Sequence, residues 1–222
     1  MNRIFAIVGV IIVVGLGALW WLSGQSSAPG LDLPAAANAQ DSDVDLSLAP
    51  DMSLGNPDAD VTVIEYASFT CPHCASFHAG TFKQLKADYI DTGKINFVHR
   101  EVYFDKFGLW AGLLARCGET PERYFAIADL IYTQQRTWTQ AANDAGVANN
   151  LMQMGRTVGM SDERLNGCLQ DQDRAQAMIA SYQQNATADG VRATPSFVIN
   201  GTLHSNMSYA DFQRILAEAG VE

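Results

Sequence analysis

Basic residues are scarce in this chain, and their scarcity argues against negatively charged binding partners. The 222 residues include 14 Lys and Arg against 24 Asp and Glu, which gives a formal net charge of −10. A chain this acidic is poorly suited to nucleic acid or to an anionic membrane surface, because both are negatively charged. The sequence also lacks a Gly-rich phosphate loop and an internal repeat, so it indicates no nucleotide site and no repeat architecture.

Charge is absent from the first apolar segment. Ile4 to Leu22 follow Arg3 and form 19 residues without a charged side chain. A helix needs roughly 17–25 residues to cross a bilayer. Residues 1–22 are therefore predicted to be a transmembrane anchor, with a cleaved signal peptide as the alternative, because Ala37-Asn38-Ala39 has the form of a processing site. Both predict that the rest of the chain is exported to an oxidising compartment.

Large apolar residues are sparse before residue 60. Residues 23–60 are rich in Ser, Ala, Gly, Pro and Asp, a composition typical of a flexible linker. The chain beyond this range is long enough for one domain with its own hydrophobic core.

Cysteine is rare as well, and two of the four cysteines stand three positions apart. Cys71-Pro72-His73-Cys74 follows an apolar run over residues 61–69 and precedes a segment, 77–90, with helical spacing. At such a strand-to-helix junction the first sulfur lies exposed at a helix N-terminus, with the second one turn inside. The positive end of the helix lowers the energy of a Cys71 thiolate, which suits reversible disulfide exchange.

Apolar periodicity predicts the order strand, helix, strand, helical block, hairpin, helix. The predicted strands are Val61–Phe69, Ile95–Tyr103, Ser196–Asn200 and Thr202–Leu203. The predicted helices are Cys71–Asp91, Leu109–Cys117, Pro121–Gln135, Ala148–Val158, one that opens at Ser161, Asp171–Ala188 and Tyr209–Ala219.

This order, together with three segments of sequence, resembles the DsbA-like thiol:disulfide oxidoreductases of the thioredoxin superfamily. The three segments are Val63–Cys74, Ile95–Glu101 and Ala193–Gly201. The resemblance implies an α/β thioredoxin fold, preceded by the anchor or signal segment and carrying an inserted helical domain. The thioredoxin-like parts would be residues 61–104 and 190–222, and the insertion residues 105–189. The family usually has a Pro after the second strand, and this chain has none between Glu101 and Phe104.

The resemblance also implies roles for the Cys-Pro-His-Cys motif. Cys71 would form the mixed disulfide with substrate, and Cys74 would be the buried partner that resolves it. Pro72 is tolerated at a helix start. His73 is placed to help the thiolate if its imidazole is protonated or donates a hydrogen bond.

Residues outside the motif receive roles on the same basis. Pro195, after Thr194, resembles the cis-proline that faces the active disulfide and lets a substrate strand pair with the backbone. Glu65 resembles a buried acid that could relay the proton of Cys74. The alternative for Glu65 is a surface ion pair, with Lys94 as a candidate partner. His78 is expected to be a solvated or packed residue.

The other two cysteines, Cys117 and Cys168, lie in different predicted helices of the insertion. Free thiols beside an oxidant would be a liability, so a structural disulfide between them is predicted, as in some members of the family. The alternative is a pair of buried, unreactive cysteines.

The favoured function is an enzyme that donates its disulfide to reduced or unfolded exported proteins. The resemblance implies reoxidation by a quinone-linked membrane partner. The enzyme is expected to be a monomer, on the periplasmic side of the bacterial inner membrane if anchored or in the periplasm if cleaved.

Two alternatives stay open. One is an isomerase or reductase of the same fold, although residues 23–60 are too short for the dimerisation domain that such isomerases carry. The other is a membrane-anchored metal-binding module that uses Cys71, Cys74 and a His. Zinc normally takes four ligands, and the sequence has no second Cys-x-x-Cys or His pair, so neither a metal nor another cofactor is expected.

Overall fold

The computed structural model describes residues 44–221. The predicted anchor or signal segment, 1–22, and the first part of the predicted linker lie outside the described residues. Between residues 44 and 221, no helix has both the length and the apolar character needed to span a bilayer.

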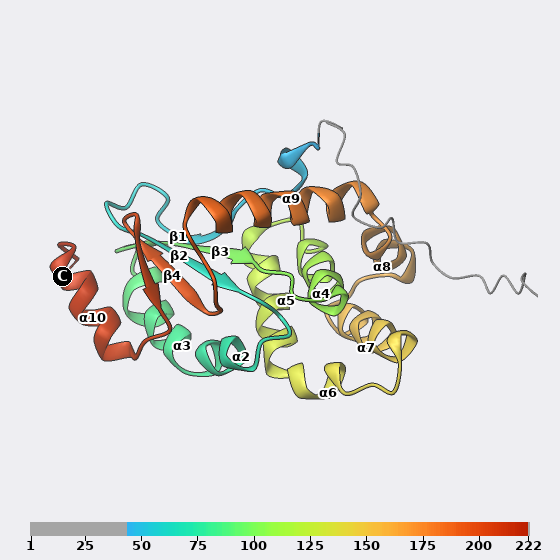
Figure 1. The fold of residues 1–222 in the computed structure, drawn as a ribbon. Helices are drawn as coiled ribbons and strands as arrows, with labels where there is room; N and C mark the ends of the chain where they lie inside the picture. The colour runs from blue at the N-terminus through green and yellow to red at the C-terminus, as the bar shows by residue number, and fades with distance from the viewer. Residues whose placement is uncertain (1–43, 222) are drawn as a thin grey trace, which may run out of the picture. The chain divides into compact units, whose positions relative to one another are not determined.

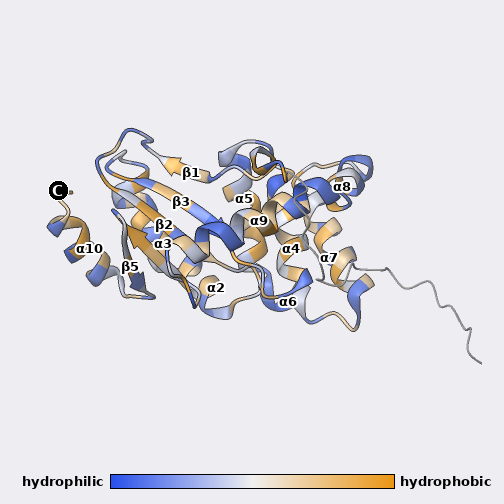
Figure 2. Ribbon diagram, turned by 45° about the horizontal axis from the view of Figure 1, so that its top comes forward, coloured by the Kyte–Doolittle hydropathy of each residue, from blue (hydrophilic) through white to orange (hydrophobic). Residues whose placement is uncertain are grey.

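A five-stranded sheet in the order β1-β3-β2-β4-β5 forms the centre of the thioredoxin-like part (Figure 1). Strands β2 (Thr62–Ala67) and β3 (Asn96–Glu101) run parallel, and β4 (Ser196–Ile199) is antiparallel to β2. All of β4 and most of β2 are buried, because helices cover both faces of the sheet. In Figure 2, hydrophobic residues (orange) occur both along the sheet and on the helices around it. Strand β5 (Thr202–Ser205) pairs with β4 through a tight turn and closes one edge.

The strand at the other edge of the sheet lies within residues that the sequence assigns to the linker. Strand β1 (Met52–Gly55) pairs antiparallel with β3, and a short 3-10 helix, η1 (Leu46–Leu48), precedes it. The predicted linker, 23–60, therefore extends too far into the domain. Its composition misled because β1 depends on pairing with the edge of β3 more than on apolar residues of its own.

The helix that follows the Cys-x-x-Cys motif is divided. The sequence predicts one helix over Cys71–Asp91, whereas the structure has α2 (Pro72–Ala79), α3 (Thr81–Leu85) and a π-helical turn, η2 (Lys86–Ile90). The division falls at Gly80, whose φ of −126° and ψ of −86° are not helical. The last helix, α10 (Tyr209–Glu218), starts at a capping box formed by Ser208 and Asp211.

Six helices make up the insertion, and they lie within the range predicted for it. They are α4 (Lys106–Arg116), α5 (Pro121–Thr133), α6 (Gln135–Thr139), α7 (Asp144–Thr157), α8 (Asp162–Leu169) and α9 (Gln172–Ala188). Side-chain caps begin five of them, at Asp105, Thr120, Asn143, Ser161 and Asp171. Figure 1 shows α4–α8 beside the sheet and α9 running back over both parts.

The insertion and the sheet share one hydrophobic core. Phe97 of β3, for example, lies against Phe125 of α5 with 6.2 Å between ring centroids. A buried ion pair joins the same two parts, because Arg116 of α4 donates to both carboxylate oxygens of Glu101 at 2.8 and 2.6 Å. Both contacts hold the insertion against β3, the strand that pairs with β2, which leads to the Cys-x-x-Cys motif.

Candidate active site

The two cysteines of the motif lie in different environments. Cys71 follows β2 and takes the N-cap position of α2 in extended conformation, with Pro72 at the first helical position. Its thiol is half-buried, whereas Cys74, one turn inside the helix, is fully buried. Both are free thiols in this structure, so it represents the reduced state of the pair.

Hydrogen bonds at the helix start lower the pKa of Cys71 to about 5. The largest cause is the hydrogen bond from the Cys74 thiol, and the side chain of Thr194 and the backbone N–H groups of Cys74 and His73 add to it, while burial opposes them. The bond to Cys71, burial and the negative charge of Glu65 raise the pKa of Cys74 above its usual range. At neutral pH the half-buried Cys71 is therefore a thiolate, whereas the buried Cys74 keeps its proton.

The loop before β4 faces Cys71. The Thr194–Pro195 peptide bond is cis, and the carbonyl oxygen of Thr194 lies 3.5 Å from Cys71 Sγ, which donates to it as a thiol. The structure thus brings together two segments 123 residues apart in the sequence. The cis Thr194–Pro195 peptide therefore lies next to the Cys71 sulfur.

Glu65 is fully buried in β2, so the alternative of a surface ion pair is wrong. Its partner is His78, whose Nε2 lies 2.9 and 3.2 Å from the two carboxylate oxygens. Lys94, the candidate partner from the sequence, lies instead over the ring of Tyr89. His78 is packed rather than solvated, since its ring stacks on Tyr132 with centroids 4.1 Å apart. It lies in α2, one turn after Cys74.

A second histidine extends this buried group. The nitrogens of His99, in β3, lie 2.7 Å from the hydroxyl of Tyr124 and 3.2 Å from that of Tyr132. Burial lowers the pKa of His99. Ligand atoms of Glu65, His78 and His99 lie within 4.8 Å of one another. In the structure these atoms have hydrogen-bond partners within the protein: His78 pairs with Glu65, and His99 with Tyr124 and Tyr132.

Gln135 holds the motif from the insertion side, and sequence reasoning missed it. Its buried Nε2 donates to the carbonyl oxygens of Phe69 and Cys71 at 2.8 and 2.9 Å. The contact spans 64 residues, from α6 to the loop that presents Cys71. No local pattern marks such a glutamine, so only the fold could find it.

A family model described as thioredoxin matches residues 47–218 of the chain. The chain belongs to the thioredoxin family. The crystal structure of alpha-DsbA1 of Wolbachia pipientis superposes with a TM-score of 0.71 at 27% identity, over 78% of this chain and 92% of that one. The predicted resemblance to DsbA proteins and the predicted thioredoxin fold with a helical insertion are confirmed.

Two relatives of the chain have names that describe disulfide chemistry. A protein of Rickettsia bellii named "Putative protein-disulfide oxidoreductase" is 37% identical over 158 residues, 71% of this chain and 60% of that protein. Disulfide bond formation protein D of Bacillus subtilis is 26% identical over 165 residues, 73% of this chain and 72% of that protein. The matched part of this chain spans 56–62% of the length of the Rickettsia relatives.

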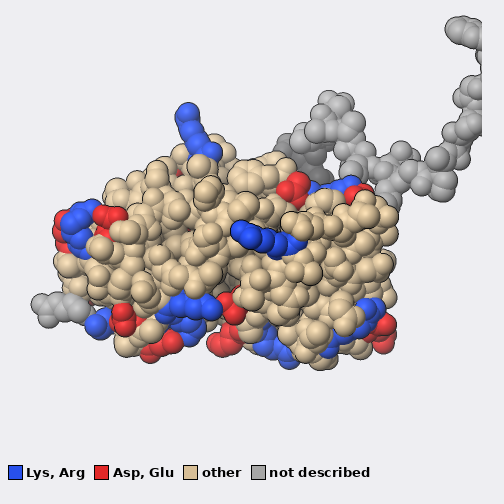
Figure 3. Space-filling view, turned by 90° about the horizontal axis from the view of Figure 1, so that it is seen from below, with Lys and Arg blue, Asp and Glu red and all other residues tan. Residues whose placement is uncertain are grey.

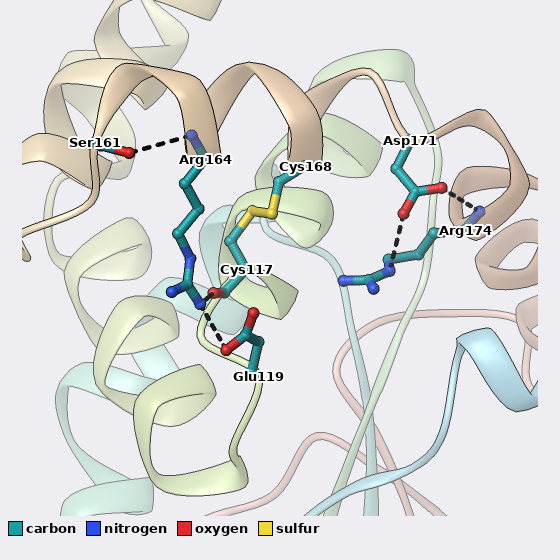
Figure 4. Close-up of a disulfide and its surroundings, with 7 residues drawn as sticks. All are labelled: Cys117, Glu119, Ser161, Arg164, Cys168, Asp171 and Arg174. Carbon is teal, nitrogen blue, oxygen red and sulfur yellow. Dashed lines mark hydrogen bonds and ion pairs between the residues drawn. A yellow bond between two sulfur atoms is a disulfide. The ribbon is translucent and has the colours of Figure 1, made fainter.

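The second cysteine pair lies in the insertion, where the structure joins Cys117 and Cys168 in a disulfide (Figure 4). The bond links the end of α4 to α8, with 5.9 Å between the two Cα atoms. Beside it, Arg164 donates to the carbonyl oxygen of Cys117 at 2.6 Å and pairs with Glu119 at 2.9 Å. The Cys117–Cys168 disulfide thus links two helices of the insertion.

Proposed function

We propose that this protein is a thiol:disulfide oxidoreductase that donates its Cys71–Cys74 disulfide to exported proteins through a mixed disulfide at Cys71. The observation that carries the proposal is the half-exposed Cys71 at the start of α2, with a pKa lowered to about 5. The buried Cys74 directly behind it supplies the second sulfur.

The exchange proceeds in two steps. A substrate thiolate attacks Sγ of the oxidised Cys71, the Cys71–Cys74 bond breaks, and Cys74 leaves with the electron pair and takes up a proton. A second substrate thiolate then attacks the substrate sulfur of the mixed disulfide, and Cys71 leaves as a thiolate. The substrate loses two electrons and two protons; one proton stays on Cys74 and the other passes to solvent.

The pKa of Cys71 sets the direction of this reaction. A thiolate stable at neutral pH stabilises the reduced protein relative to the disulfide, so the disulfide accepts electrons readily. The low pKa also makes Cys71 a good leaving group in the second step.

Residues around the pair have supporting roles in the proposal. Glu65 is buried close enough for its charge to raise the pKa of Cys74, and it passes the proton that Cys74 gains or loses. Thr194 and Pro195 offer backbone to an extended substrate strand. His73 contributes its backbone N–H to the Cys71 thiolate, and Pro72 fixes the start of α2.

The compartment and partners follow from the same proposal. The protein acts on reduced exported proteins outside the cytoplasm, as a monomer, held by or released from the segment 1–22. A quinone-linked membrane partner reoxidises Cys71 and Cys74. The disulfide between Cys117 and Cys168 suits such an oxidising compartment, because cytosolic proteins rarely keep structural disulfides.

Equilibration with glutathione tests the direction. The fraction of the protein with an oxidised Cys71–Cys74 pair is measured by acid quenching and alkylation over a series of glutathione redox buffers at pH 7. The proposal expects a potential well above the roughly −270 mV of a reducing thioredoxin. A potential at or below that value, together with efficient reduction of insulin, would assign the protein to the reductases instead.

A further inference from the structure

A hollow of about 490 Å³ lies beside the redox motif and takes no part in the exchange steps above. Thr70 and Pro72, the neighbours of Cys71, form one wall, and the start of α4 and the helix α6 form the other. Its volume is in the range of ligand-binding pockets. Any chain bonded to Cys71 must pass its mouth, because both neighbours of that cysteine line it.

Of the two charged side chains that line the hollow, Asp105 has hydrogen-bond donors around it and Arg136 has no acidic partner among the described residues. The Asp105 carboxylate accepts hydrogen bonds from the backbone of Phe107 and Gly108 at 2.8 and 2.9 Å and from the Thr70 hydroxyl at 2.8 Å. Arg136 also lines the hollow and is exposed. In the described part of the chain, no Asp or Glu forms an ion pair with it. The cation is thus available to a ligand, whereas the carboxylate is already occupied.

The remaining lining fits a peptide better than a small ion. Phe107 and Pro72 supply apolar surface beside the polar groups of α6. Figure 3 views the side of the molecule on which α2 and α6 lie in Figure 1, and charged side chains are few across its middle. One unpaired arginine beside an apolar wall favours a peptide segment with a carboxylate side chain.

We propose that this hollow is a substrate subsite that receives the residues flanking the substrate cysteine, and that Arg136 selects Asp or Glu there. The inference rests on the proposed function, since it needs a substrate chain bonded to Cys71. It adds a specificity that neither Cys71 nor the Thr194–Pro195 loop supplies, because those groups contact sulfur and backbone.

The test compares rates of peptide oxidation. Dithiol peptides carry Glu, Gln or Lys at one position, scanned over three residues on each side of the first cysteine. Oxidised full-length protein oxidises each peptide under quenched-flow conditions at low and high salt. We expect one position at which Glu reacts two- to fivefold faster than Gln, and Lys more slowly, as suits an exposed ion pair. The preference should weaken in high salt.

Two variants separate local contact from overall charge. Arg136→Gln should bring the Glu-to-Gln rate ratio close to one. Arg123→Gln is the matched control, because Arg123 is also exposed and also lacks an ion pair among the described residues, but it lies near the start of α5. It should keep the full ratio.

The outcomes are distinct. A ratio near one at every position in the unmodified protein would overturn the subsite, as would a ratio that survives Arg136→Gln or falls equally in Arg123→Gln. Failure of the proposed function would give a different result, because none of the peptides, including those with Gln, would be oxidised.

Discussion

At the scale of single residues, the proposed exchange depends on how Cys74 gains and loses its proton. Glu65 is buried with His78 as its partner, and its charge acts on Cys74. Glu65→Gln keeps the size and the hydrogen bond but cannot carry the proton. We expect peptide oxidation at pH 7 to slow about 100-fold, at the lower end of what general acid–base catalysis contributes, while the pKa of Cys71 changes little.

The control for that change is His78→Gln, which retains an N–H donor for Glu65. It should slow the reaction much less than Glu65→Gln if Glu65 is the group that moves the proton. An unchanged rate in Glu65→Gln would remove Glu65 from the mechanism. The substitution to Ala is avoided, because leaving one member of a buried pair alone is strongly destabilising.

Gln135 carries a second prediction at this scale. Gln135→Ala leaves the Phe69 carbonyl without its donor, whereas the Cys71 carbonyl still accepts from Ala75. We expect a loss of about 1–3 kcal/mol in the free energy of unfolding, measured with urea. The pKa of Cys71 should rise, because the loop that presents it to the helix start is loosened.

The exposed neighbour Gln134 gives a matched control. Gln134→Ala should leave both quantities unchanged. If Gln135→Ala lowers stability but does not move the pKa of Cys71, Gln135 is a packing residue only and the positioning role is wrong.

Some of these residues can be predicted from the sequence and others cannot, for physical reasons. The motif and Thr194–Pro195 are local patterns, so their likeness to a family is visible in the chain. Glu65 is visible as an acid in an apolar strand. His78 and Gln135 owe their roles to contacts with Glu65 and with the 69–71 loop, which only the folded chain creates.

At the scale of elements, the disulfide between α4 and α8 should stabilise the insertion. Its ends are 51 residues apart, and a cross-link of this kind typically contributes about 2–4 kcal/mol. We expect the double substitution Cys117→Ala with Cys168→Ala to lower the free energy of unfolding by that amount. Urea denaturation of the two proteins measures it, and equal midpoints would contradict a bracing role.

The helices and strands also show where apolar periodicity fails to predict secondary structure. The predicted helices of the insertion overlap the observed ones because side-chain caps and apolar stripes are local. Strand β1 was missed because it needs the edge of β3. The division at Gly80 was missed because a single glycine is tolerated in many helices.

At the scale of the whole molecule, redox state and stability are coupled. The pKa of Cys71 falls from the usual 9.0 of a thiol to about 5 on folding, so ionisation stabilises the folded reduced protein. For a lowered pKa this stabilisation is complete above the pKa of the unfolded chain and is lost as pH falls through about 5. Solvent screening at the half-exposed Cys71 reduces its size.

The reduced protein should therefore unfold at higher urea than the oxidised protein at pH 7. The difference should shrink as the pH falls from 7 to about 5 and level off below that pH. An oxidised form that is the more stable of the two at pH 7 would contradict the proposed direction of exchange.

The central claim concerns one ionisation, and ultraviolet absorbance at 240 nm follows it directly. Reduced protein is titrated from pH 3 to pH 9, with the oxidised protein as the baseline and Cys71→Ser as the control that loses the signal. The account predicts a thiolate that forms with a midpoint near 5. A midpoint between 8 and 9, as for a free cysteine, would contradict it.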